Sequence, residues 1–379
     1  MRVWPLRRRR RLVPPLPSDD LLVTEETLRR ALDGVLHVRE RQIRGPVIVF
    51  RGDLQVDRSR ALDALLPRLA PYGYTPFVRA ERDGVTVQAW PLGDMTQPAR
   101  PLLAVALFVA TVISTFLAGA FFFVGSETFD AFRALPFPGW LVSGAPFALT
   151  LLTILGVHEF GHYFTARHYG AAVSLPYFIP APMLFGTFGA IIRMRSPARD
   201  RNSLFDIAAA GPLAGLMVAV PALIVGLMWS HVGTTTAGAG FGGFGYSLLT
   251  RLFVYLRFGA LPAGSSIVTH PIADAAWVGC FVTALNLVPV GQLDGGRIAY
   301  ALSARRHRLL GVGSWVVLLG LGALTGSVNW FVWAALLLFL VGFDHSPPLD
   351  DLTPLSPMRW LLGIVCLALV ILLLPPIPI

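Results

Sequence analysis

Lysine is absent from this 379-residue chain, and cysteine and charged residues are scarce. Charged residues make up 14% of the sequence, whereas soluble globular domains carry about 25%. The two cysteines, Cys280 and Cys366, each lie within an apolar run, so neither a disulfide framework nor a cysteine-rich zinc site is expected. Hydrophobic residues make up 54% of the chain. These proportions predict that most of the chain lies in lipid rather than in water.

The positive charge is unevenly placed along the chain. Residues 1–11 contain six arginines and no acidic residue, whereas residues 12–100 contain twelve arginines and twelve acidic residues. A nucleic-acid-binding domain would spread its basic charge over a folded surface. We therefore predict a disordered basic tail at residues 1–18 near anionic lipid, and we expect no nucleic-acid partner. A nucleic-acid-binding arm is the alternative interpretation of this tail.

Residues 19–97 are predicted to form a small soluble α+β domain. Apolar spacing predicts two helices, and Asp83-Gly84 indicates a turn between two strands. The expected elements are a helix over Leu21–Glu40, a strand over Val47–Phe50, a helix over Ser59–Leu69, and strands over Thr75–Ala80 and Val85–Trp90. Pro98 and Pro101 then mark the linker to a membrane-embedded part, residues 98–379.

The membrane-embedded part contains seven apolar runs that we interpret as membrane-spanning helices. They cover Leu102–Val124, Trp140–Phe164, Ile207–Met228, Ile272–Val290, Leu309–Leu324, Val328–Phe343 and Trp360–Leu374. Leu248–Leu261 is either an amphipathic surface helix or an eighth span. The predicted fold class is a polytopic α-helical membrane protein with about seven transmembrane helices and a small N-terminal soluble α+β domain.

Arginines in the loops between these runs predict the orientation of the chain. Arg100, the arginines between 193 and 201, those between 297 and 308, and Arg359 fall on one side of the membrane if seven spans alternate. Cytosolic loops carry an excess of arginine and lysine, so this side is expected to be cytosolic. The N-terminal domain is then expected to be cytosolic too.

The second span ends in His158-Glu159-Phe160-Gly161-His162, which has the spacing of a zinc site. Residues four apart lie on one face of a helix, so both imidazoles can reach one zinc ion. Glu159 can then take a proton from water that the metal activates. Ionisable groups inside a membrane span are costly and usually functional. A polar cluster that packs helices, or a proton relay, is the alternative.

A catalytic zinc site needs a third protein ligand and an open position for water. Other histidines lack supporting context or, like His270, lie on the outer side together with Asp274. Asp294 follows the fourth span on the same side as His162. Pro289 and the neighbouring glycines permit an interrupted helix, which is tolerated at membrane depth only where it is buried in protein or lines a wet cavity. The alternative role of Asp294 is that of a turn residue at a helix end.

Together these motifs resemble those of the site-2 protease family, the zinc intramembrane proteases. The resemblance rests on His158-Glu159-x-x-His162 and on Asn286-x-x-Pro289-x-x-x-Leu293-Asp294-Gly295. Further similar segments are Gly186–Ala190, Ala210–Gly215 and Asp344–Pro348. The soluble unit Val47–Pro91 resembles the domain before the protease in the bacterial and plastid branch typified by the ethylene-dependent gravitropism-deficient, yellow-green proteases.

The resemblance implies one zinc ion held by His158, His162 and Asp294, with Glu159 as general base and acid. It also implies that Asn286 positions the substrate or stabilises the oxyanion. An amide can donate a hydrogen bond to a developing negative oxygen, but an interhelical hydrogen bond is an equal alternative for this residue.

The stretch Ser174–Arg193 is apolar but too rich in proline and glycine for a helix. We expect a re-entrant loop with a strand edge, in which Gly186, Thr187, Phe188 and Gly189 bind the substrate. An edge strand can add an extended peptide through backbone hydrogen bonds. Such an edge would hold open a transmembrane substrate helix that has locally unwound for cleavage.

The predicted function is therefore that of an intramembrane zinc metalloendopeptidase that hydrolyses transmembrane protein substrates in the lipid bilayer, with a bacterial cell membrane as the expected location. A transporter whose histidine and acidic side chains relay protons is the alternative, although the chain lacks the internal repeats common in transporters. A catalytically inactive scaffold is a third hypothesis, against which the intact motif argues. No oligomeric state is predicted.

Overall fold

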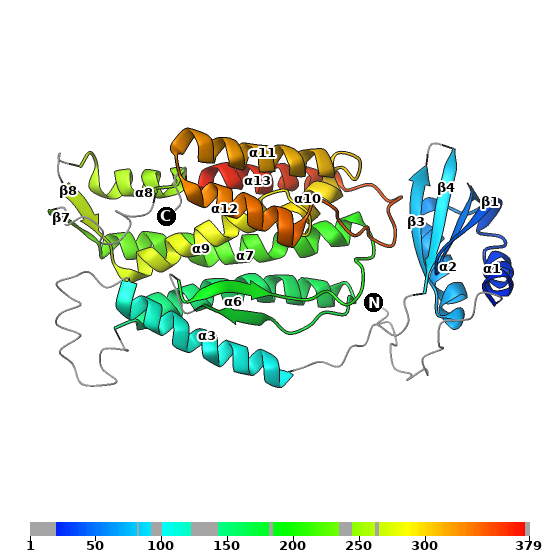
Figure 1. Ribbon diagram of the computed structural model, residues 1–379, viewed down its shortest axis with the longest axis horizontal. Coiled ribbons are helices and arrows are strands. Elements are labelled where there is room, and N and C mark those ends of the chain that lie inside the picture. The colour runs from blue at the N-terminus through cyan, green and yellow to red at the C-terminus, as the bar shows by residue number, and fades with distance from the viewer. Residues whose placement is uncertain are drawn as a thin grey trace.

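The computed structural model describes residues 20–81, 83–91, 101–122, 143–181, 185–234, 245–261 and 265–375. The basic tail predicted at residues 1–18 lies outside the described residues. Most of the helices run roughly parallel to the long axis of the molecule (Figure 1). A small α/β unit lies beyond one end of these helices, and a short strand hairpin lies at the other end (Figure 1).

The N-terminal unit is a four-stranded antiparallel sheet with two helices. Its strands are ordered β1-β2-β4-β3, so the second hairpin is paired to the first through β2 and β4. Apolar side chains of the helices and strands form a core of their own. The elements are α1 Asp20–Ala31, β1 Leu36–Arg44, β2 Val47–Leu54, α2 Arg58–Leu69, a 3₁₀ turn Ala70–Tyr72, β3 Thr75–Glu81 and β4 Gly84–Trp90.

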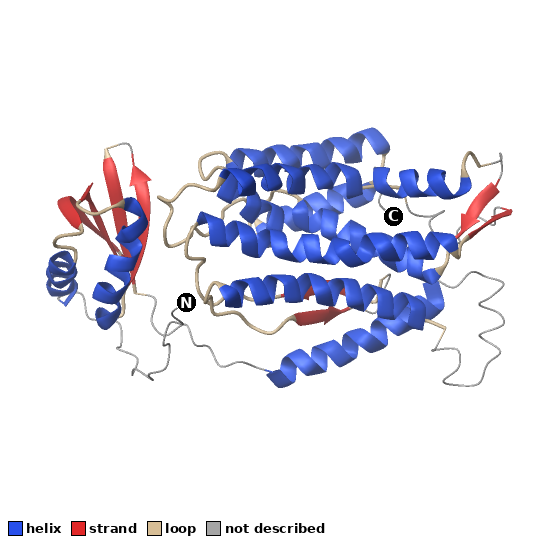
Figure 2. Cartoon of the chain, turned by 180° about the vertical axis from the view of Figure 1, so that it is seen from behind, coloured by secondary structure: helices blue, strands red, loops and turns tan. Residues whose placement is uncertain are grey.

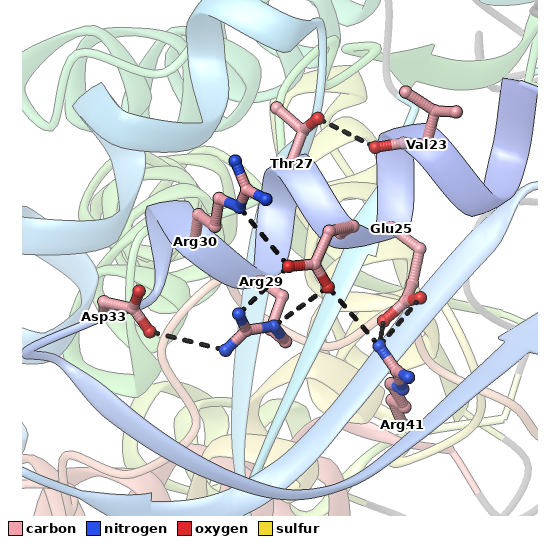
Figure 3. Close-up of polar contacts among 8 residues, drawn as sticks. Val23, Glu25, Thr27, Arg29, Arg30, Asp33 and Arg41 are labelled. Carbon is pink, nitrogen blue, oxygen red and sulfur yellow. Dashed lines mark hydrogen bonds and ion pairs between the residues drawn. The ribbon is translucent and has the colours of Figure 1, made fainter.

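The helix predicted over Leu21–Glu40 is wrong beyond Ala31. The chain turns at Gly34, whose φ of 75° suits glycine, and then continues as β1. Strand β1 is mostly polar and exposed, so it has no apolar alternation by which sequence could identify it. Its pairing with β2 forms it, and Arg41 of β1 reaches back to Glu25 of α1 at 3.1 Å (Figure 3).

Each of the seven predicted spans coincides with a helix in the part of the chain that the structure describes. Three of these helices, α3, α7 and α11, are long and apolar enough to cross a membrane, and α9, α12 and α13 are shorter apolar helices. The chain is therefore membrane-embedded, and the count of seven spans stays a prediction. The bounds are α3 Pro101–Phe122, α6 Ala145–His168, α7 Arg201–Met228, α9 Pro271–Leu287, α11 His307–Thr325, α12 Val328–Leu336 with a π turn Leu337–Val341, and α13 Pro357–Leu373.

Helix α7 lies at the centre of the membrane-embedded part, packed against both α6 and α9 (Figures 1 and 2). Buried side chains from these three helices form the largest apolar core, which includes Phe147, Leu223, Trp277 and Phe281. The stretch Leu248–Leu261 contains α8, Leu248–Phe258, whose 11 residues are too few to cross a bilayer. It packs against α7 and α13.

Two short hairpins interrupt the helices. The first pairs β5, Tyr177–Pro180, with β6, Thr187–Ile191, inside the stretch for which a strand edge was predicted. It packs against α3, where the Ser114 hydroxyl donates a hydrogen bond to the Gly186 carbonyl at 2.6 Å. The second pairs β7, His231–Thr234, with β8, Ser265–Val268, at the end of the molecule farthest from the N-terminal unit (Figure 1).

The N-terminal unit is joined to the membrane-embedded part by backbone hydrogen bonds. The segment before α13 adds to the edge of β3: the Val78 amide donates to the Leu349 carbonyl at 2.7 Å, and the Asp351 amide donates to the Val78 carbonyl at 2.9 Å. On its other side, the Asp350 amide donates to the Arg199 carbonyl at 2.8 Å. Figure 1 shows this segment, in orange-red, reaching from the helices toward β3.

Side chains extend this junction. Leu352 of the joining segment is 7% exposed and belongs to the apolar core of the N-terminal unit. Arg199 of the membrane-embedded part forms an ion pair with Asp63 of α2 at 2.5 Å. The two parts of the chain are therefore joined by an isolated β-bridge and a shared core residue, which hold the N-terminal unit over one end of the helices.

Candidate metal centre

Helix α6 carries three buried ionisable side chains in its second half. His158, Glu159 and His162 are 3%, 5% and 3% exposed. The helix is continuous from Ala145 to His168, so the four-residue spacing places both imidazoles on one face. Their ring centroids lie 4.9 Å apart in an edge-to-face arrangement.

Asp294 lies opposite the two histidines, and three ligand atoms converge there. The Asp294 Oδ2 is 3.1 Å from His162 Nε2 and 3.5 Å from His158 Nε2, and the two Nε2 atoms are 3.2 Å apart. Ligand atoms about 2.0–2.1 Å from a tetrahedral zinc ion lie roughly 3.3–3.4 Å from one another. The three donors therefore already have the mutual spacing of a tetrahedral site, and in the part of the chain that the structure describes they are the one group of three or more such side chains placed to hold a metal.

The ring of His162 is oriented by the backbone of α7. Its Nδ1 lies 2.6 Å from the Ile207 carbonyl oxygen. A carbonyl only accepts hydrogen bonds, so Nδ1 carries the proton and donates it to this oxygen. The Nε2 atom that faces Asp294 is then left with a free lone pair, as a metal ligand requires.

The close approach of α7 to the zinc-motif helix depends on two glycines. A Cβ added at Gly211 would lie 2.5 Å from His162 Cε1, and closer still to its Nε2. A Cβ at Gly215 would lie 3.2 Å from His158 Nδ1. Gly211 and Gly215 therefore make room for the two imidazoles.

Asp294 reaches the histidines because the chain turns sharply after α9. Helix α10, Asp294–Leu302, begins at this residue, and Gly291 just before it has a φ of 47°. Side chains at Gly295 and Gly296 would overlap with backbone atoms of Leu287 and Gly291. The glycines on both sides of Asp294 therefore fold the start of α10 back onto the end of α9, which places the carboxylate beside α6.

Asn286 lies in the last turn of α9 and is partly exposed. Its side chain makes no hydrogen bond within the described part of the chain, so the interhelical hydrogen bond considered for it is not observed there.

The predicted substrate residues lie on the first hairpin, which packs against α6 as well as α3. Gly186 and Gly189 have φ values of 77° and 97°, and Thr187 donates a hydrogen bond to the Ile179 carbonyl at 2.9 Å. Phe188 is 73% exposed. The hairpin leads to the buried side chains of α6, because the backbone of Ile192, which follows β6, interacts with the Glu159 carboxyl.

Two residues near the site were not identified from sequence. Arg297 lies one turn after Asp294 on α10, and His345 lies in the segment between α12 and α13. Burial, together with the charges of Arg297 and His307, lowers the pKa of His345 to about 3. Both ring nitrogens of His345 are buried without a hydrogen-bond partner in the described part of the chain. Only the resemblance of Asp344–Pro348 to a family segment pointed to this region.

Comparison with known proteins finds similar proteins among the peptidases. Residues 146–325, which include all three convergent ligands, match the family model described as Peptidase family M50. Among curated proteins, the chain is similar to "Probable zinc metalloprotease EGY2, chloroplastic" of Oryza sativa subsp. indica, with 30% identity over 344 residues, covering 87% of this chain and 62% of the relative. It is 34% identical over 239 residues to the protein of the same name from Arabidopsis thaliana, covering 63% of this chain and 43% of the relative.

A third relative, "Probable zinc metalloprotease EGY1, chloroplastic" of Oryza sativa subsp. japonica, is 36% identical over 255 residues, covering 64% of this chain and 42% of the relative. The chain thus spans about two fifths to three fifths of the length of these curated relatives. The predicted resemblance to the plastid branch is confirmed. The relatives are named as chloroplast proteins, so they do not support the predicted bacterial membrane. No solved structure matches the chain as a relative.

Proposed function

We propose that this chain is an intramembrane zinc metalloendopeptidase of the site-2 protease kind that hydrolyses membrane-protein substrates, because residues 146–325 match the model of Peptidase family M50. One observation carries the proposal. His158, His162 and Asp294, from two helices far apart in sequence, present three ligand atoms at tetrahedral spacing next to the Glu159 carboxylate. A proton-relay transporter would not require this spacing.

The bound metal, Glu159 and Asn286 would each carry out a different part of peptide hydrolysis. When bound, a zinc ion would supply the Lewis acid that polarises a peptide carbonyl and acidifies water. Glu159 follows the first ligand directly and is buried, so it can hold a proton taken from the attacking water and return it to the leaving amine. Asn286 would donate a hydrogen bond from its amide to the carbonyl oxygen as negative charge develops there.

The strand β6 would hold the substrate. In the described chain β6 pairs only with β5, which leaves one edge with unpaired backbone groups, and Ile192 at its end lies beside Glu159. An unwound substrate segment added to this edge would pass the catalytic carboxylate. Phe188→Ala should raise the KM for a membrane substrate without loss of bound zinc, since Phe188 is exposed and distant from the ligands in sequence. An unchanged KM would argue against this edge.

We further propose that the membrane-embedded part crosses the bilayer seven times with the N-terminal unit in the cytosol. The arginine-rich loops and the N-terminal unit lie toward the same end of the helices, where the backbone junction with β3 forms. An excess of arginine marks the cytosolic side of membrane proteins. The membrane itself would be that of a plastid or of a bacterium.

The decisive experiment compares wild type with Glu159→Gln in purified full-length protein. Zinc content is measured by mass spectrometry, and hydrolysis is measured on solubilised membrane proteins. Because Glu159 is not among the convergent ligands, the variant should keep its zinc and lose hydrolysis by at least about a hundredfold, the usual contribution of a general base.

Asp274→Asn is the matched control, because Asp274 is also a buried carboxyl but lies in the first turn of α9. This variant should retain hydrolysis. Hydrolysis by neither wild type nor variant would support the transporter. A Glu159→Gln variant that cleaves as fast as wild type would refute the catalytic role.

A further inference from the structure

A cleft of about 520 Å³ lies where the N-terminal unit faces the membrane-embedded part. One wall is formed by Phe77, Arg79 and Trp90 of β3 and β4. The other walls are formed by the chain that follows β6, by the start of α10 and by the segment that contains His345. The two parts of the chain therefore build this cleft together.

The charge of the cleft is entirely positive. Four arginines line it, His345 adds a neutral imidazole, and none of its lining residues is acidic. Arg79, Arg193 and Arg297 form no ion pair within the described residues, although Arg297 makes a long contact of 3.7 Å with the Met194 sulfur. Three arginines thus line one cavity without forming an ion pair within the described residues, an arrangement that favours binding of anionic groups.

The cleft adjoins the proposed catalytic site. Ile192, which interacts with Glu159, lines the cleft, and so does Arg297, one helical turn after Asp294. A peptide lying along β6 and past Glu159 would therefore continue into the cleft. Phe77 and Trp90, whose rings pack edge-to-face at 5.9 Å, offer an apolar surface beside the arginines.

We propose that this cleft binds an acidic segment of the substrate that flanks its transmembrane helix on the side of the N-terminal unit. This inference rests on the proposed function. Juxtamembrane segments on the cytosolic side of membrane proteins are usually rich in lysine and arginine. The cleft would repel such segments and attract acidic ones, so it would select among membrane proteins by the charge of this flank.

The test uses the full-length Glu159→Gln variant in nanodiscs of phosphatidylcholine, which carries no net charge. Three fluorescein-labelled octapeptides are compared by anisotropy: one alternating Asp and Ser, one alternating Asn and Ser, and one alternating Arg and Ser. The acidic peptide should bind, and the other two should bind at least about tenfold more weakly.

Substitutions then locate the site. Arg79→Gln should weaken binding of the acidic peptide about fivefold, as expected for loss of one partly exposed ion pair, whereas Arg79→Lys should largely retain it. Arg60→Gln is the matched control, since Arg60 is an exposed arginine of the same unit that does not line the cleft. Equal binding of the three peptides, or equal effects of Arg79→Gln and Arg60→Gln, would overturn the proposal.

A second arm separates this inference from the proposed function. Reporter proteins with one transmembrane helix and an acidic, amide or basic flank are incubated with the wild-type chain. Faster cleavage of the acidic reporter supports the charge filter, and equal cleavage of all three overturns it while leaving the protease intact. Absence of all cleavage refutes the proposed function, and the peptide-binding result then stands by itself.

Displacement of the acidic peptide by phosphatidylglycerol vesicles, with equal cleavage of the reporters, would instead assign the cleft to anionic lipid.

Discussion

Replacement of Gly211 by alanine tests whether α7 controls the metal centre. A Cβ at this position would lie 2.5 Å from His162 Cε1, whereas real Cβ atoms essentially never approach within 3.0 Å and ordinary contacts begin at 3.4 Å. The imidazole must therefore move by about 1 Å, or α7 must retreat by a similar distance. Metal ligands are held within about 0.2 Å of their required distances. Either movement would also disturb the hydrogen bond from His162 Nδ1 to Ile207.

The expected magnitude follows from the two interactions that are disturbed. Loss of a partner that orients a metal-ligating histidine typically weakens metal affinity 10–100-fold, or about 1.4–2.7 kcal/mol. Gly211→Ala also displaces the ligand itself, so we expect a loss of about 100-fold or more. The assay is competition for zinc with a chromophoric chelator, together with metal content of the purified protein.

Two control variants distinguish this effect from general damage. Gly156→Ala lies on α6 and meets nothing within 4 Å, so it should bind zinc as wild type does. Gly226→Ala on α7 would overlap with the backbone of Ala273 on α9, so it should lower stability while retaining zinc in the protein that folds. Gly211→Ala protein that holds one zinc ion with wild-type affinity would refute the reasoning.

Two further predictions concern the junction between the N-terminal unit and the helices. Leu352→Ala should lower the free energy of unfolding of the N-terminal unit by about 2–4 kcal/mol, because it removes a buried side chain from its core, and a denaturant midpoint that does not shift would contradict this. Burial and the charges of Arg297 and His307 lower the pKa of His345 to about 3, and the Tyr300 ring packs against the imidazole. The folded protein therefore keeps His345 neutral, whereas the unfolded chain protonates it below about pH 6.5. Stability should therefore fall as pH decreases from about 6.5 toward 3, by up to about 2 kcal/mol at pH 5, and thermal unfolding of His345→Gln should show a smaller fall over this range than wild type.

Local sequence patterns were sufficient for the parts of this protein that depend on one helix. His158 and His162 lie on one face of α6 because of helix periodicity, and the apolar runs coincide with helices because burial in lipid depends on composition. Asp294 could be nominated because glycines and proline mark an interrupted helix. That its carboxylate lies 3.1 Å from His162 Nε2 depends on how α10 folds back, and this required the structure.

Contacts between distant segments were decided by tertiary structure. Strand β1 has no apolar alternation and forms because β2 pairs with it. The local sequence pattern therefore predicted that the preceding helix continues through this segment. Gly211 has the same local signature as any helix-packing glycine, and only the packing of α7 on α6 shows that it makes room for the His162 imidazole. Leu352 follows β4, the last strand of the N-terminal unit, by some 260 residues, but it belongs to the core of that unit because backbone hydrogen bonds to β3 place it there. Periodicity and composition are properties of neighbouring residues, whereas the spacing between separate helices and strands is set by their packing, which no short stretch of sequence encodes.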